Sequence, residues 1–84
     1  MNKLAKEYPF IHIYPQQKPR QPVIIKANTE GLCVLLNAIV TAIAQPERDG
    51  MAEVFDGDAE VYEVIVQVVN THQELTSLPY QQEK

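Results

Sequence analysis

The fold is decided by residues 23–46, VIIKANTEGLCVLLNAIVTAIAQP, where a β-branched run leads directly into a helix signal. The first residues of this stretch favour a strand, because β-branched side chains fit a pleated surface. Asn28 is a typical N-cap, Glu30 places a negative charge in the first helical turn, and Pro46 stops the helix. The stretch therefore predicts a strand followed by one long helix.

The predicted helix carries more apolar surface than a single sheet can cover. At about 100° per residue, one side gathers the large aliphatic residues that we expect to face the sheet, Leu32, Leu35, Leu36, Ile39 and Ile43. Val34 interrupts the narrow polar strip on the other side. A helix over a sheet needs roughly a third of its circumference to be apolar, so we predict that Val34 contacts another protein.

The chain before the helix predicts two strands joined by a stiff link. Residues 10–14 are bracketed by Pro9 and Pro15 and favour a short edge strand, because proline cannot donate to a sheet ladder. Residues 15–22 hold three prolines, which indicates an exposed, proline-rich connection.

The chain after the helix predicts a hairpin formed by residues 51–55 and 60–69. It turns at Asp56-Gly57-Asp58, because the positive φ that glycine tolerates favours tight turns. The order β–β–α–β–β predicts an α+β fold in which one helix packs on a four-stranded antiparallel or mixed sheet. A chain of 84 residues forms one domain, and we expect residues 1–9 and 81–84 to be frayed.

The second arm of this hairpin has an outer face that is partly apolar. Its even positions, from Tyr62 to Val68, are apolar and are expected to face the helix. The odd positions include Val61, Ile65 and Val69, which a fully solvated face would not require. We predict that these three residues contact a protein partner.

Acidic residues gather around the same hairpin. Residues 1–26 carry five basic side chains and one acid, residues 27–84 carry two and ten, and the net charge is −4. This balance argues against general affinity for nucleic acid or anionic membranes, and a nucleic-acid contact through the basic first segment is a third hypothesis. We predict that a basic partner is steered by Glu53, Asp56, Asp58, Glu60 and Glu63.

Few residues could carry chemistry. Cys33 is the single cysteine, which excludes an internal disulfide and a Cys-based zinc site, and we expect it to pack in the core. His12 and His72 do not form a short metal-ligand pair, and no phosphate- or dinucleotide-binding motif occurs. We predict a protein that is not an enzyme, with no catalytic, cofactor-binding or metal-binding residues and no cofactor. The alternative is a small-ligand-binding protein or minor enzyme with a helix–sheet pocket near Tyr62, Asn37 and His12.

The chain also lacks the usual membrane signals. No apolar run approaches the roughly 18–20 residues of a membrane span, and the first residues lack the apolar segment of a signal peptide. We therefore predict a cytoplasmic protein without a membrane partner.

Three motifs together resemble a known group of proteins. They are the strand end and helix start NTEGL at residues 28–32, the hairpin DGDAEVYEV at 56–64, and the closing LPY at 78–80. Over about residues 23–80 the chain resembles the small bacterial immunity proteins of polymorphic toxin systems. The resemblance implies a non-enzymatic protein that sequesters a cognate toxin, and it carries over no catalytic residue.

The sequence thus predicts a non-catalytic, immunity-like protein-binding domain that self-associates as a homodimer. Its partner is a second copy or a basic protein. Its mechanism would be surface occlusion, in which buried apolar anchors supply the affinity and acidic side chains steer the approach.

Overall fold

The computed structural model describes residues 8–78 and confirms an α+β fold. Its elements are β1 (Ile11–Tyr14), β2 (Ile24–Ala27), α1 (Thr29–Ala44), β3 (Gly50–Phe55), β4 (Val61–Val66) and a 3-10 helix (His72–Glu74). The predicted order of strands and helix is confirmed within these residues. Residues 1–7 and 79–84, which include most of the predicted frayed ends and part of the closing motif, lie outside the described residues.

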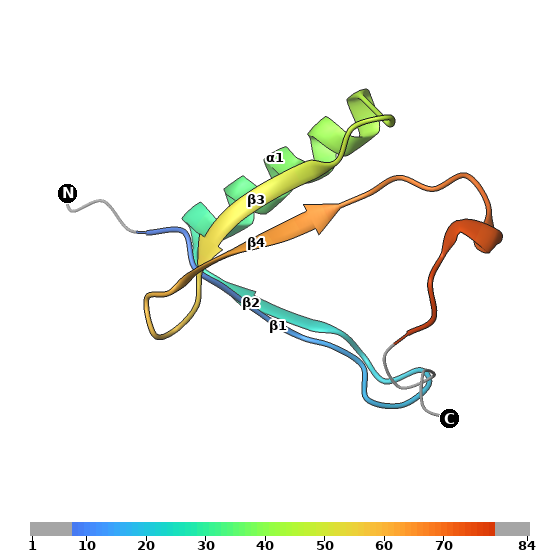
Figure 1. The fold of residues 1–84 in the computed structure, drawn as a ribbon. Coiled ribbons are helices and arrows are strands. Elements are labelled where there is room, and N and C mark those ends of the chain that lie inside the picture. Colours follow the sequence, from blue (N-terminus) through green and yellow to red (C-terminus); the bar gives the residue numbers. More distant parts are fainter. Residues whose placement is uncertain (1–7, 79–84) are drawn as a thin grey trace.

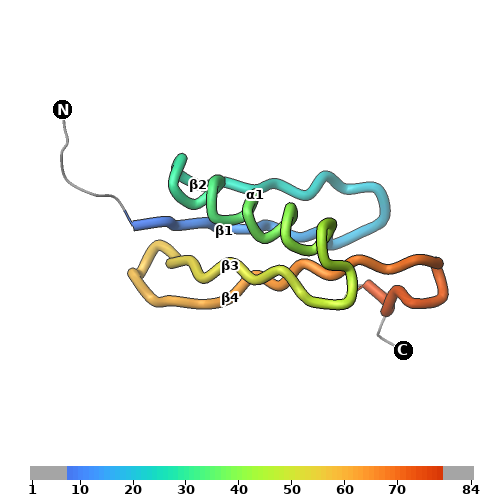
Figure 2. Tube along the Cα trace, turned by 90° about the horizontal axis from the view of Figure 1, so that it is seen from above, coloured from blue at the N-terminus to red at the C-terminus, as the bar shows by residue number. Residues whose placement is uncertain are grey.

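The four strands form two antiparallel pairs, so the predicted four-stranded sheet is replaced by two two-stranded sheets. β1 pairs with β2, and β3 pairs with β4. From above, the strands lie side by side in the order β2, β1, β3, β4 (Figure 2), and an isolated bridge between Phe10 and Phe55 joins the two pairs. At this bridge the N–H of Phe55 donates to the backbone oxygen of Pro9 at 2.9 Å. Pro9 has no N–H and cannot donate a second hydrogen bond to the other strand. Beyond it the hairpins diverge (Figure 1).

Asn28 couples the start of the helix to the segment before β1. Its side-chain oxygen accepts the N–H of Gly31 at 2.8 Å, which confirms the predicted N-cap. The same oxygen accepts the N–H of Phe10 at 3.1 Å, and the side-chain amide donates to the oxygen of Tyr8 at 2.7 Å. One side chain therefore fixes the helix relative to a segment 18 to 20 residues away in sequence.

The helix packs mainly through its small side chains. The prediction that its large aliphatic residues face the sheet is wrong for Leu32, Leu36, Ile39 and Ile43, whereas Leu35 is partly buried and packs against the core. Gly31, Ala38 and Ala42 are buried, whereas Leu36 and Ile43 are 59% and 67% exposed. Cys33, which we expected in the core, is exposed as well.

Gly50 at the start of β3 explains why α1 packs through its small side chains. A Cβ atom at Gly50 would overlap the carbonyl oxygen of Ala38, so helix and strand approach each other backbone to backbone. Ala52, the next residue on the same side of β3, is fully buried. Such a close approach is possible only along glycine and alanine, and it turns the larger side chains of α1 outward.

The core is correspondingly small. Within residues 8–78 the buried apolar residues are Ile11, Ala38, Ala42, Ala52 and Val54. The inward positions of β4 confirm the predicted alternation, because Tyr62, Val64 and Val66 pack against this core. The strand ends at Val66, however, so Val68 lies beyond it and is partly exposed. Since three of the five buried residues are alanines, burial within one chain supplies little hydrophobic free energy.

The turn between β3 and β4 is where we predicted it, but glycine does not provide the left-handed residue. Ala59 has the positive φ, 63°, whereas the φ of Gly57 is not positive. Asp56 closes the turn by accepting the N–H groups of Asp58 at 2.9 Å and Glu60 at 3.0 Å. These hydrogen bonds hold a conformation that alanine alone disfavours.

Candidate protein interface

The side of β3 and β4 that points away from α1 carries four of the nine predicted contact residues, Glu53, Val61, Glu63 and Ile65. Its cross-strand pairs are Met51 with Ile65, Glu53 with Glu63, and Phe55 with Val61. We call these six residues the outer face. Because side chains alternate along a strand, the residues between them point toward the helix and the core.

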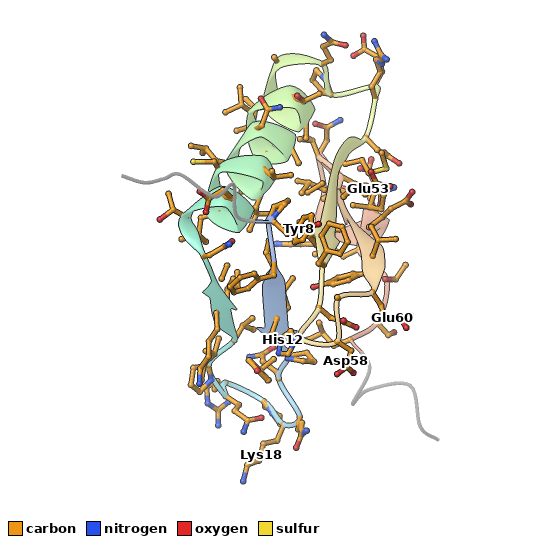
Figure 3. The ribbon with its side chains drawn as sticks, turned by 90° about the vertical axis from the view of Figure 1, so that its left-hand side faces the viewer. Tyr8, His12, Lys18, Glu53, Asp58 and Glu60 are labelled. Carbon is orange, nitrogen blue, oxygen red and sulfur yellow. The ribbon has the colours of Figure 1, made fainter. Side chains whose placement is uncertain are left out.

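The outer face combines exposed apolar side chains with an acidic centre. Met51, Val61 and Ile65 are 53%, 55% and 47% exposed. Glu53 lies directly opposite Glu63, an arrangement of like charges that destabilises a strand pair. In Figure 3, Glu53 and Glu60 lie on the side of the hairpin remote from α1. An apolar surface around two opposed carboxylates is suited to a partner that brings a positive charge.

The acids of the turn divide into two kinds. Asp58 and Glu60 are exposed beside the outer face and are available to a partner. The carboxylate of Asp56 is already engaged, because the N–H groups of Glu60 and Asp58 donate to it and hold its pKa below the ordinary value of 3.8. Asp56 therefore shapes the turn, while its neighbours carry accessible charge.

The lowered pKa of Asp56 predicts an acid-sensitive hairpin. The folded chain releases this proton more readily than the unfolded chain, so the carboxylate stabilises the fold above pH 3.8 and this contribution is lost as pH falls through the lowered folded pKa. We expect Asp56→Asn to be less stable than the natural chain at pH 7, with the difference shrinking toward pH 2, in urea unfolding followed at a series of pH values. A difference independent of pH would show that the charge of Asp56 does not matter.

Five predicted contact residues do not belong to the outer face. Asp56, Asp58 and Glu60 lie in the turn beside it, and Val34 and Val69 lie elsewhere. Val34 is partly buried and packs against the core from α1. Val69 follows the end of β4 and lies in the segment leading to the 3-10 helix. Met51 and Phe55, in contrast, belong to the outer face and were not predicted as contact residues. The alternation of β3, with Glu53 between these two apolar positions, was the signal that could have identified them.

A second apolar surface lies on α1 and was also missed, because all of its residues except Val40 were predicted to face the sheet. It consists of Leu32, Leu36, Ile39, Val40 and Ile43, all exposed. The close packing of Ala38 on Gly50 leaves these side chains on the outside of the helix.

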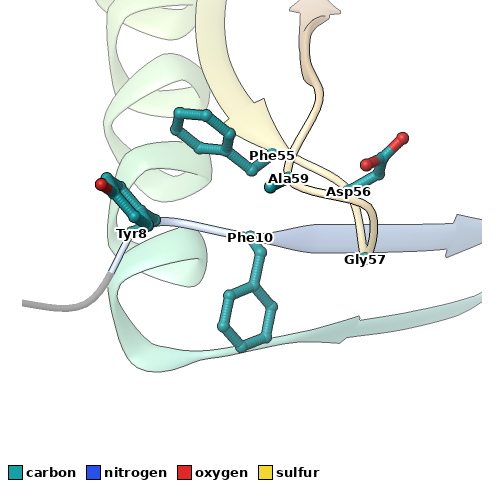
Figure 4. A pocket seen from close by; sticks show the side chains of 6 residues that line it. All are labelled: Tyr8, Phe10, Phe55, Asp56, Gly57 and Ala59. Atoms are coloured by element: carbon teal, nitrogen blue, oxygen red, sulfur yellow. The ribbon is translucent and has the colours of Figure 1, made fainter.

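A shallow hollow lies at the end of β3 (Figure 4). It has a volume of about 290 Å³ and is lined by Tyr8, Phe10, Phe55, Asp56, Gly57 and Ala59. The rings of Tyr8 and Phe55 lie 5.1 Å apart. Its ionisable side chains are the phenol of Tyr8 and the carboxylate of Asp56, and this carboxylate accepts a hydrogen bond from the N–H of Asp58 in the turn. The hollow is small for a ligand site, which is typically about 300–1,000 Å³ with converging polar groups.

The residues predicted to line a helix–sheet pocket are not brought together. The hydroxyl of Tyr62 donates to the oxygen of Ile11 at 2.5 Å, and burial raises the pKa of this phenol. Asn37 is exposed on the helix. His12 accepts the N–H of Gly57 at 2.9 Å and lines another hollow, of about 380 Å³, to which neither of the other two contributes.

Three further observations bear on function. Among residues 8–78, no group of three or more His, Cys, Asp or Glu side chains is arranged to hold a metal ion. In the same part of the chain, no helix combines the length and apolar character needed to cross a bilayer. Comparisons with protein-family models, curated proteins and solved structures found no match to this chain.

Proposed function

We propose that this chain is a non-catalytic protein-binding domain that covers a basic surface with its outer face and also associates with itself. The supporting observation is the uncovered set of Met51, Val61 and Ile65 around the opposed carboxylates of Glu53 and Glu63. The apolar side chains would supply affinity when they are buried, and the carboxylates would steer a cationic partner into place.

The same mechanism fits an immunity-like role, in which a cognate toxin is sequestered by occlusion of its surface. Such a role needs no catalytic group, and it requires a contact face that stays accessible in the folded chain. It predicts that a captured partner is harmful to the cell when produced without this chain. A captured protein that is harmless on its own would contradict the immunity role and leave protein binding in place.

Replacement of Ile65 by lysine tests the contact surface. Ile65 is 47% exposed, so the variant should fold, but a charge in the middle of an apolar contact should weaken association at least tenfold. Self-association is measured by analytical ultracentrifugation, and other partners by capture from native cell extract with each variant as bait. Ile43→Lys, on the exposed side of α1, is the matched control and should behave as the natural chain. Unchanged sedimentation together with unchanged capture would overturn the proposal.

A further inference from the structure

Residues 11–27 form an arm whose outer part is exposed in the described part of the chain. We use this name for β1, β2 and the proline-rich connection between them. Figure 1 shows the arm diverging from β3 and β4 toward its tip. Ile11 is buried at its base, whereas Tyr14, Ile24 and Ile25 are nearly half exposed. Because an isolated two-stranded hairpin is only marginally stable in water, the outer part of the arm is suited to an intermolecular contact.

The arm is held in shape before any contact is made. The side-chain amide of Gln16 donates to the oxygen of Gln21 at 2.7 Å, and the N–H of Gln17 donates to the side-chain oxygen of Gln21 at 2.6 Å. Near the base of the arm, the ammonium of Lys26 lies 5.7 Å from the ring centre of Tyr14. A segment already ordered loses less conformational entropy on binding than a flexible loop.

The arm and the second hairpin carry opposite charges. Residues 11–27 contain Lys18, Arg20 and Lys26 and no acid, whereas residues 50–66 contain five acids and no base. In Figure 3, Lys18 lies at the tip of the arm, well separated from Glu53 on β3. Because the arm projects away from β3 and β4, its tip does not reach the outer face of its own chain.

We propose that the outer face receives the arm of a second copy of this chain, and that the exchange is mutual. The inference rests on the proposed function, because it identifies the partner of the same surface. Tyr14 pairs with Ile24 on the side of the arm that also carries Lys26. This side offers a cation next to one apolar pair, which complements the opposed glutamates and an apolar pair beside them. A mutual exchange gives a closed dimer with two-fold symmetry.

The geometry of the outer face supports this occupant. A lysine from the arm would lie between the carboxylates of Glu53 and Glu63 and offset the repulsion that their register imposes. The contact would also bury Met51 and Ile65, which the small core of one chain leaves outside. Folding and dimerisation would then be linked, so that the midpoint of thermal unfolding rises with protein concentration.

Two charge-reversed variants test the exchange. The arm variant carries Lys18→Glu and Lys26→Glu, and the face variant carries Glu53→Lys and Glu63→Lys. Each should self-associate at least about tenfold more weakly than the natural chain, because both of its contacts join like charges. Mixed in equal amounts, they should form a one-to-one heterodimer, since each arm then meets a face of opposite charge. Sedimentation equilibrium gives the dissociation constants, and native mass spectrometry identifies the mixed species.

Leu36→Lys, on the exposed side of α1, is the control and should leave the dimer intact. Circular dichroism establishes that every variant is folded. The proposal is overturned if the natural chain is monomeric at about 100 μM, if Leu36→Lys splits the dimer, or if the two charge variants do not combine. A monomeric chain that still captures a protein through Ile65 would remove the exchange and the proposed self-association, and would retain the proposed binding of a basic partner.

Discussion

Replacing Asn28 with alanine should lower the free energy of unfolding by about 3 kcal/mol, because the variant loses an N-cap and two further hydrogen bonds. The natural side chain accepts from Gly31 and Phe10 and donates to Tyr8, at distances of 2.7 to 3.1 Å. The free energy of unfolding of native domains is only about 5–15 kcal/mol, and this domain has a core built largely from alanine. Urea unfolding followed by circular dichroism measures the loss.

Two variants separate the three hydrogen bonds of Asn28. Asn28→Asp retains the oxygen that accepts from Gly31 and Phe10 but cannot donate to Tyr8, so its stability should lie between those of the natural chain and Asn28→Ala. Asn37→Ala removes an exposed asparagine from the same helix and should change stability by less than about 0.5 kcal/mol. Equal effects at the two positions would show that Asn28 does not join the helix to the first strand.

Gly50→Ala should destabilise the fold by roughly 3 kcal/mol, the upper part of the range for overpacking. The added methyl group would overlap the carbonyl oxygen of Ala38, and backbone cannot rotate away as a side chain can. The helix would have to move off β3, which would loosen the contact of Ala38 and Ala52 as well. Differential scanning calorimetry should report a lower midpoint and a lower enthalpy of unfolding.

Gly57→Ala is the matched control for this substitution. A Cβ atom there would lie 3.3 Å from the ring of His12, which is exposed and can shift slightly. Its φ is not positive, so alanine introduces no backbone strain, and the change should be less than about 1 kcal/mol. If both glycines tolerated alanine equally well, α1 and β3 would not be in backbone contact.

The order of the elements, the N-cap and the second hairpin could be predicted because each depends on residues close in sequence. Asn28 stands immediately before the helix, and the turn at Asp56 uses acceptors and donors within four residues. The side on which the helix packs depends instead on Gly50, which lies on a different element from Ala38 and allows close contact only with small residues. Hydrophobic periodicity favours the largest side chains as the buried face, and here four of the five residues that it selected are exposed.

The candidate interface could be predicted only in part, because local alternation assigns a residue to one side of a strand but gives neither the register nor the end of that strand. Alternation along β4 was sufficient to place Val61, Glu63 and Ile65 on one side, since a strand has a fixed period of two. The pairing of Glu53 with Glu63 depends on register, which the turn length determines. Val69 was misplaced because the strand ends at Val66, and nothing in the local alternation marks that end.

Pro22 and Lys26, on either side of residues 23–25, bear on the tendency of the chain to aggregate at high concentration. Three consecutive β-branched residues that are largely exposed are the kind of segment from which amyloid fibrils grow. Pro22 precedes them without an N–H to donate, and Lys26 follows with a charge that repels its own stacked copies. The run between these gatekeepers is shorter than the roughly six residues that a steric zipper requires. We therefore expect Pro22 and Lys26 to oppose fibril growth from this segment.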